Sequence, residues 1–170
     1  LYQLIDTNTI KYVRVTNKSD LAYIKQNNYY VTPQFYGKES LMFFCKINDT
    51  FYNVLIFKQD LRKNILDINY NYLHIYKIKI NVPKHLYKGT LFDGILFNKN
   101  NITHFVINDL LVHNGKVTDD TISNKQNITN TLINSFQKNK FFNITINKFF
   151  TITQIKELYY DKIKQSAYDI

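Results

Sequence analysis

The stretch from Gly89 to Lys116 constrains the fold of this 170-residue chain more than any other. Two apolar runs, residues 89–97 and 102–111, each have the length of a β-strand, and a short Asn-rich turn separates them. An Asn-Gly pair at residues 114–115, which favours a tight turn, follows the second run. The sequence therefore predicts two consecutive strands with a further turn behind them.

Apolar alternation and turn residues predict more strands on both sides of this stretch. We expect strands at residues 29–32, 41–47, 51–57, 73–80 and 141–148, with tight turns at residues 33–37 and 48–49. Capping residues ahead of helical periodicity predict helices from Ser19 or Asp20 to Lys25, from Asp119 or Asp120 to Phe136, and from the capping box at residues 151–154 to Ile163.

These elements predict the α+β class, with a mainly antiparallel, twisted sheet flanked by helices. At 45% apolar residues the chain can build a core, and its length predicts a single domain over residues 1–170. A start at Leu1 rather than Met is compatible with a fragment of a longer polypeptide.

The charge balance favours a polyanionic partner. Lys and Arg number 22 against 13 Asp and Glu, a net charge of +9, and such an excess binds RNA through release of phosphate counterions. Coding from an A/T-rich genome would also raise the lysine content, so the charge alone leaves both explanations open.

Cysteine and histidine usage predicts an intracellular, cytoplasmic protein without a metal site. Cys45 is the single cysteine, which excludes an internal disulfide framework and a cysteine-rich zinc cluster. His74 and His85 have no carboxylate or cysteine at ligand spacing, so we expect both at the surface. No apolar run approaches the about 20 residues of a membrane span, so no membrane partner is expected.

Two segments resemble motifs of the covalent nucleotidyltransferases, the superfamily of mRNA-capping guanylyltransferases and DNA/RNA ligases. Residues 90–94, Thr-Leu-Phe-Asp-Gly, are similar to a "T-L-hydrophobic-D-G-E" strand. Residues 105–116 are similar to an "F-hydrophobic-hydrophobic-hydrophobic-D-L-L…N-G-K" strand, in the form found in capping enzymes of large DNA viruses and cytoplasmic linear plasmids. The resemblance covers roughly residues 29–160, includes all four glycines, and implies a guanylyltransferase-like fold.

A third motif of that family carries the nucleophilic lysine, and residues 31–44 align with it. Pro33, Gly37 and the following apolar run match the framework, but Gln34 stands at the lysine position. Tyr36 and Glu39 replace an aspartate and an arginine of that motif, and Ile95 replaces the glutamate of the "D-G-E" strand. A glutamine amide cannot attack a phosphorus as an amine does. Lys38, four residues further on, is the one remaining candidate for the nucleophile.

The resemblance implies nucleotide or RNA contacts at Gln34, Lys38, Asp93, Phe105 and Asp109. Phe105 would stack on a base, or else it is a core aromatic. Asp109 would face the ligand, or else it is a strand-end carboxylate held by backbone amides.

The favoured hypothesis is a degenerate, non-catalytic guanylyltransferase-like domain. It would bind RNA 5′ ends or nucleotide, or serve as a scaffold for other subunits of a capping or transcription complex. One alternative is an active mRNA guanylyltransferase, using GTP with Mg²⁺ or Mn²⁺, whose nucleophile is misaligned or whose other motifs lie outside this chain. A second alternative is a structural subunit that coats RNA in a large RNA–protein assembly.

Overall fold

The computed structural model describes residues 29–61, 74–154 and 156 of the chain. These residues gather into two compact units, one holding residues 36–146 and the other holding the remaining described residues from both ends of that range. The expectation of one domain over residues 1–170 stays a prediction.

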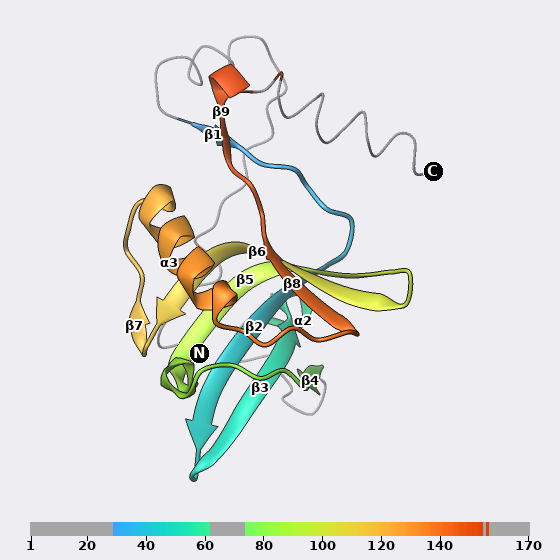
Figure 1. Cartoon of the computed structure of the whole chain (residues 1–170), viewed down its shortest axis with the longest axis vertical. Helices are drawn as coiled ribbons and strands as arrows, with labels where there is room; N and C mark the ends of the chain where they lie inside the picture. Colours follow the sequence, from blue (N-terminus) through green and yellow to red (C-terminus); the bar gives the residue numbers. More distant parts are fainter. Residues whose placement is uncertain (1–28, 62–73, 155, 157–170) are drawn as a thin grey trace. The chain divides into compact units, whose positions relative to one another are not determined.

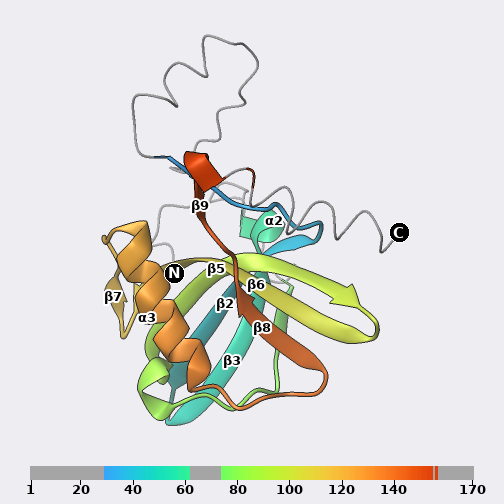
Figure 2. The same ribbon diagram turned by 45° about the horizontal axis from the view of Figure 1, so that its top comes forward.

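In the first unit, the described strands form one twisted seven-stranded sheet (Figures 1 and 2). Its long strands are β2 (Lys38–Ile47), β3 (Thr50–Phe57), β5 (Lys88–Lys99) and β6 (Ile102–His113), and its short strands are β4 (Ile75–Lys77), β7 (Lys116–Val117) and β8 (Phe142–Ile146). The order β4-β3-β2-β5-β6-β7 is antiparallel throughout, and β8 pairs with β6. The strands predicted within residues 41–57 and 89–111 are confirmed.

Three two-residue turns join consecutive strands of this sheet. Both central residues of each turn have a positive φ: 46° and 63° at Asn48–Asp49, 52° and 61° at Asn100–Asn101, and 51° and 79° at Asn114–Gly115. This pair of conformations defines the turn whose twist matches that of flanking strands, and Asn, Asp and Gly adopt it most readily. The local sequence therefore sets the register of β2 with β3, of β5 with β6 and of β6 with β7.

Strand β8 departs from the antiparallel pattern. Its residues Phe142–Ile146 run parallel to Thr103–Ile107 of β6. A parallel pair needs a long crossover, and helix α3 (Ile122–Asn134) lies in that connection, packed against β6 and β8 (Figure 1). A mostly antiparallel sheet with few helices is an α+β fold, as predicted. No helix in the described part of the chain is long and apolar enough to span a membrane.

Each face of the sheet carries its own apolar cluster, because successive strand residues point to opposite faces. Helix α3 and the short helix η3 (Lys84–Tyr87) contribute to one face, here called the α3 face, whose core is Met42, Phe44, Leu55, Ile80, Leu86, Phe92, Phe105, Ile107, Leu110 and Leu132. The short helix α2 (Lys58–Leu61) contributes to the other, the α2 face, whose core is Leu41, Ile56, Leu61, Leu91 and Val112.

Strand β4 is shorter than the strand predicted over residues 73–80, whose first residue lies outside the described residues. Asn53 of β3 accounts for the early end. Its side-chain amide donates to the carbonyls of Ile78 at 3.4 Å and Ile80 at 2.9 Å, and its backbone carbonyl accepts from Ile78 N at 2.9 Å. The backbone bond extends the β3–β4 pairing by one residue, and the side-chain bonds then take its place as far as Ile80, which lies in the core.

The start of α3 differs by one or two residues from the prediction, which placed the cap at Asp119 or Asp120. Thr121 is the capping residue, and its hydroxyl accepts from Asn124 N at 3.3 Å. Asp120 instead accepts from Thr121 N at 2.8 Å and from the Asn124 side chain at 2.9 Å. Thr121 has the extended backbone that a capping residue needs, so the hydroxyl takes the capping position.

The second unit is a small antiparallel pair with side-chain ties. Strand β1 (Tyr30–Val31) pairs with β9 (Phe150–Thr151), and the Thr32 hydroxyl donates to Lys148 O at 3.0 Å. The helical turn η4 (Ile152–Gln154) follows, and the Gln154 side chain accepts from Thr151 N at 3.0 Å, as in a capping box.

Two of the predicted helices fall wholly or mostly among the residues that are not described. The helix expected from Ser19 or Asp20 to Lys25 lies outside the described residues. The helix expected to run from residue 151 to Ile163 is described only at residues 151–154 and 156.

Candidate functional site

Asp93 and Asp109, the two acids of the motif-like strands, lie opposite each other in the sheet. Asp93 on β5 is the register partner of Asp109 on β6, and a register shift follows between Asp93 and Gly94. Paired residues of neighbouring strands lie side by side, which brings the two carboxylates to one place on the α2 face. The two acids are therefore neighbours in the sheet, and their contact with a nucleotide or RNA stays a prediction.

Lys58 neutralises Asp93. Its Nζ lies 3.0 Å from Oδ1 and 3.2 Å from Oδ2 of Asp93, and the two side chains are only 15% and 12% exposed. Lys58 begins α2 directly after β3, while Leu61 at the end of α2 packs into the α2-face core and holds this short helix in place. The sequence did not identify Lys58 as a site residue, because no local pattern distinguishes a lysine after the end of a strand from any other surface lysine.

Lys125 performs the same role for Asp109. Its Nζ, on α3, lies 3.1 Å from Oδ2 of Asp109, and Oδ1 accepts from Leu110 N at 2.8 Å. We call Lys58, Asp93, Asp109 and Lys125 the charged row. One of the two sequence-based alternatives for Asp109 was a carboxylate held by backbone amides. The structure shows one such amide, that of Leu110, and the Lys125 side chain in addition.

Burial raises the pKa of the Asp93 carboxyl, and the Lys58 ammonium acts against that shift. The negative charges of Asp109 and Glu39 raise the pKa further. Glu39 lies on β2, where it pairs with Ile95 of β5. Lys58 is therefore the cation that opposes the effect of burial and of the two neighbouring acids on the pKa of Asp93.

Gly94, next to Asp93, is required by close packing. A Cβ placed there would lie 2.4 Å from the carbonyl oxygen of Val106 and 2.7 Å from Cζ of Phe105. Any side chain would push β5 and β6 apart and separate Asp93 from Asp109. The Asp-Gly pair thus serves the spacing of the two acids.

The charged row does not fit the divalent cation that the family resemblance implies. Both oxygens of Asp93 accept from Lys58, and both oxygens of Asp109 already have donors. A metal ion would have to displace an ammonium group from each carboxylate. Among residues 29–61 and 74–154, no three histidine, cysteine or acidic side chains gather as a metal-binding group.

Within the first unit, the predicted contact residues Phe105 and Lys38 do not join Asp93 and Asp109. Phe105 is fully buried in the α3-face core, so its ring is a core aromatic with no face open to a base. Lys38 lies on the α3 face, because it alternates with Glu39, and its Nζ stands 4.7 Å from the centre of the Phe57 ring. Gln34 belongs to the second unit, where it is exposed.

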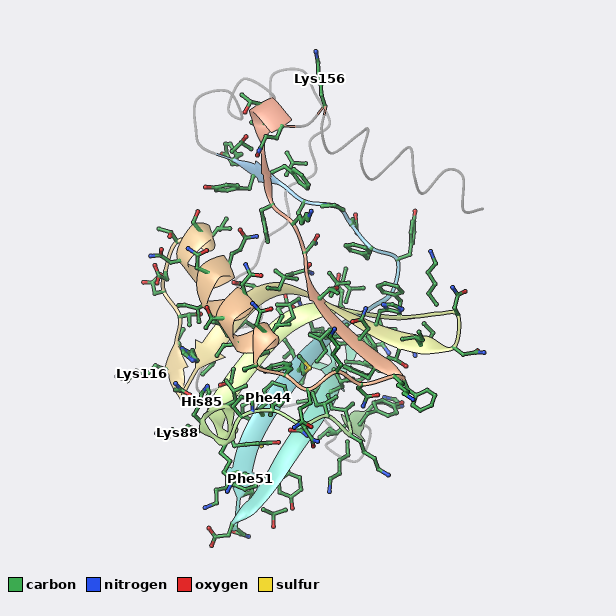
Figure 3. The ribbon with its side chains drawn as sticks, in the orientation of Figure 1. Phe44, Phe51, His85, Lys88, Lys116 and Lys156 are labelled. Carbon is green, nitrogen blue, oxygen red and sulfur yellow. The ribbon has the colours of Figure 1, made fainter. Side chains whose placement is uncertain are left out.

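One end of the sheet is basic. His85, Lys88 and Lys116 are gathered at this end in Figure 3, while Phe44 points into the core. Gly115 N donates to Gly89 O at 2.7 Å, which holds the backbones next to Lys88 and Lys116 together. We call His85, Lys88 and Lys116 the basic end.

Near the basic end, both burial and a neighbouring positive charge lower the pKa of a histidine, His113. Burial lowers the pKa of His113, and the charge of His85 lowers it further. His74 lies elsewhere, at the β4 edge, where its ring nitrogen is 3.0 Å from Asp60. The sequence had suggested no carboxylate partner for His74, and Asp60 is one.

Comparison with known proteins finds one viral relative. The chain is 33% identical over 101 residues to an uncharacterized protein of Acanthamoeba polyphaga mimivirus. The match covers 59% of this chain and 30% of the mimivirus protein, so the chain spans less than a third of that relative's length. No protein-family model matches the chain.

Proposed function

We propose that this chain is a degenerate guanylyltransferase-like domain that binds RNA 5′ ends or nucleotide without forming a covalent adduct. The observation that carries the proposal is the charged row, whose two acids lie on the hairpin β5–β6. This hairpin bears the two motif-like segments, and Asp93 and Asp109 are brought together in it at the motif positions. A guanylyltransferase-like fold of the first unit is part of the proposal.

The chemistry of the motif positions favours binding over covalent transfer. Covalent transfer needs an amine at the position of Gln34, and Gln34 offers an amide. Lys38 cannot serve the same site as Asp93, because the two lie on opposite faces of the sheet. Two lysines occupy the carboxylates that would otherwise hold a metal ion for phosphoryl chemistry.

In this proposal, the lysines of the charged row supply the hydrogen-bond donors for a phosphate group. Each ammonium has three N–H groups, and one carboxylate uses at most two of those on Lys58. The remaining donors can bind phosphate oxygens, and Lys125, on α3, lies beside a partly exposed Asp109. A role as a scaffold for other capping or transcription subunits is compatible with the same surface.

The first experiment separates binding from catalysis. The purified chain is incubated with α-labelled GTP and Mg²⁺ or Mn²⁺, beside an active guanylyltransferase, and resolved on a denaturing gel. We expect no labelled adduct. An acid-labile, alkali-stable adduct on this chain would overturn the proposal and favour an active enzyme.

The second experiment tests recognition of the RNA end. Three RNAs of one sequence, with a 5′ cap, a 5′ triphosphate or a 5′ hydroxyl, are titrated against the wild type and Lys125→Ala. We expect the cap or the triphosphate to bind several-fold more tightly than the hydroxyl, and Lys125→Ala to remove that preference. Equal binding of all three RNAs would exclude 5′-end recognition.

The basic end favours a second candidate function, a structural subunit that coats RNA. His85, Lys88 and Lys116 present positive charge at one end of the sheet, which attracts any phosphate backbone. This candidate predicts steep salt dependence without preference for a cap or a triphosphate. Charge reversal at Lys88 and Lys116 would then weaken binding of all three RNAs equally.

A further inference from the structure

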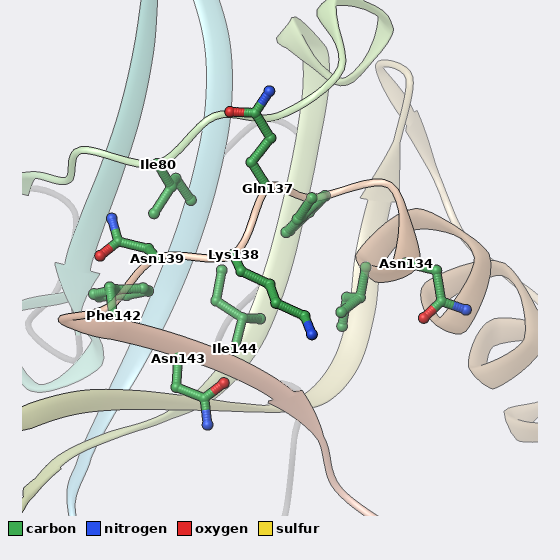
Figure 4. Close-up of a pocket in the computed structure, with 10 residues that line it drawn as sticks. Ile80, Asn134, Gln137, Lys138, Asn139, Phe142, Asn143 and Ile144 are labelled. Atoms are coloured by element: carbon green, nitrogen blue, oxygen red, sulfur yellow. The ribbon is translucent and has the colours of Figure 1, made fainter.

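A pocket of about 360 Å³ opens on the α3 face, away from the charged row. It lies between the end of α3, the turn at residues 137–139, strand β8, and Ile80 of the linker, which we define as residues 78–83 between β4 and η3 (Figure 4). A volume of this size falls in the range of small-molecule sites in proteins.

The floor of the pocket is apolar and fixed. It consists of Ile80, Ile133, Phe136, Phe142 and Ile144, which are part of the α3-face core or pack against it. The Phe136 ring meets the buried Phe44 ring edge-on, with centroids 5.8 Å apart. Because these side chains are held by the core, the floor exists before any ligand arrives, which lowers the entropy cost of binding.

Hydrogen bonds to the linker fix the rim. Asn81 donates from its side chain to Oε1 of Gln137 at 2.7 Å and accepts from Gln137 N through its backbone carbonyl at 3.2 Å. Asn139 donates to Lys79 O at 2.8 Å, and its Oδ1 accepts from Phe141 N at 2.9 Å. The side-chain oxygens of Gln137 and Asn139 thus already accept hydrogen bonds. The groups that these two side chains can still present to a ligand are N–H donors.

Among the described residues that line the pocket, Lys138 is the charged one. Its side chain runs from the turn across the pocket toward β8 in Figure 4. None of the described residues of the lining is an aspartate or glutamate that could neutralise Lys138. Amide donors and an ammonium beside an apolar floor that includes two aromatic rings suit an anion with an apolar or aromatic part.

We propose that this pocket binds one nucleotide, with the base against Phe142 and Ile144 and the phosphate at Lys138. Bases pack on aromatic and apolar side chains and offer carbonyl and ring-nitrogen acceptors to amide donors. The chain's net charge of +9 favours the same class of ligand. The proposal does not depend on 5′-end recognition, because none of the described residues that line the pocket belongs to the charged row.

The nucleotide could be a free nucleoside monophosphate or one residue of a single-stranded RNA, and two probes separate these sources. The first is GMP, with AMP and UMP compared, measured by calorimetry. The second is a ten-nucleotide RNA with a 5′ hydroxyl and a 3′ fluorophore, measured by anisotropy. The hydroxyl end keeps this test separate from recognition of a cap or a triphosphate.

Matched lysine variants decide whether Lys138 acts through the pocket. We expect Lys138→Ala to weaken binding of the probe that binds the wild type by about tenfold, as loss of a charged hydrogen bond does. Lys140→Ala removes an exposed lysine outside the lining, and we expect a change of less than about twofold. Equal losses of affinity in the two variants would show that Lys138 acts only through general attraction of phosphate, and would overturn the proposal.

A pocket-filling variant supplies the second test. Ile133→Trp adds bulk to the floor without changing charge, and we expect it to abolish the binding that Lys138→Ala weakens. Its folding is checked by circular dichroism, and Ile144→Met, a conservative change of the floor, is expected to retain binding. Undiminished binding by a folded Ile133→Trp, or no binding of either probe by the wild type at millimolar concentration, would exclude the pocket.

Discussion

Lys58 donates to both carboxylate oxygens of Asp93, at 3.0 and 3.2 Å, although the two residues lie 35 positions apart in the chain. The pair is largely buried, so neither group can rely on water for its solvation. A buried ion pair of this kind is costly to break, because removal of one partner leaves the other charge uncompensated. The free energy of unfolding therefore depends on whether Asp93, on the β5–β6 hairpin, carries its negative charge.

Lys58→Met should lower the free energy of unfolding by about 2–4 kcal/mol near neutral pH. Burial, Asp109 and Glu39 would then raise the pKa of Asp93 without opposition. A carboxyl whose folded pKa is raised is favourable below its unfolded pKa, and that contribution is lost as pH rises through the folded pKa. Urea unfolding should thus show a deficit that shrinks from about pH 8 to about pH 5.

The control for this prediction is Lys46→Met. Lys46 pairs with the exposed Asp49 at the tip of the β2–β3 hairpin, where an ion pair contributes less than about 1 kcal/mol. A deficit in Lys58→Met that stays constant over this pH range would show that lost packing, and not the charge of Asp93, is responsible.

Gly94→Ala should destabilise the first unit by about 3 kcal/mol, because its Cβ would meet the Val106 carbonyl oxygen. The backbone of β6 cannot yield without breaking its pairing with β8. Thermal unfolding measures the loss. Asn98→Ala, at an exposed position of the same strand, should change stability far less, and equal effects would contradict the packing argument.

Thr121→Ala should cost about 1 kcal/mol, since its hydroxyl caps α3 through Asn124 N. Asp119→Ala provides the comparison, because Asp119 was a predicted cap and does not make this bond. Chemical denaturation of the two variants should separate them. A larger loss from Asp119→Ala would place the cap at the residue that the sequence suggested.

His113 should make the protein less stable in mild acid. Burial and His85 lower its pKa in the folded state, so the unfolded chain, with an ordinary pKa of about 6.5, binds the proton more readily. Stability is complete above that value and falls as pH drops through it toward the folded pKa. His113→Gln should flatten the stability profile between about pH 7.5 and about pH 5.

His85→Gln tests the two causes of the His113 shift separately. It removes the neighbouring charge and leaves His113 buried, so we expect an acid-dependent loss smaller than in the wild type but still present. A wild-type profile that is flat over this range would contradict the lowered pKa.

Local signals in the sequence predicted much of the sheet. Asn48–Asp49 and Asn100–Asn101 are residue pairs that prefer a positive φ, and the apolar runs beside them have strand length. Hairpins formed by adjacent strands depend on such nearby residues. The amino-acid sequence alone is therefore enough to predict the β2–β3 and β5–β6 pairings.

Long-range relationships could not be predicted in the same way. The parallel pairing of β8 with β6 and the bonds from Lys58 to Asp93 join residues 35 or more positions apart, and no local pattern encodes them. Phe105 has the same sequence pattern whether it stacks on a base or fills a core, and only its neighbours distinguish the two. Sequence identifies the residue types of the site, whereas packing decides which of them meet.

The docking of β8 also protects the protein from self-association. Without β8, the backbone N–H and C=O groups of Thr103–Ile107 would form an open strand edge beside apolar side chains. Such an edge is a template for strands of other copies. Because β8 arrives only after α3 has crossed the sheet, a chain emerging from the ribosome exposes this edge until residue 146 is made. Aggregation during synthesis, and exchange of β8 between two copies, are the hazards that this late strand brings.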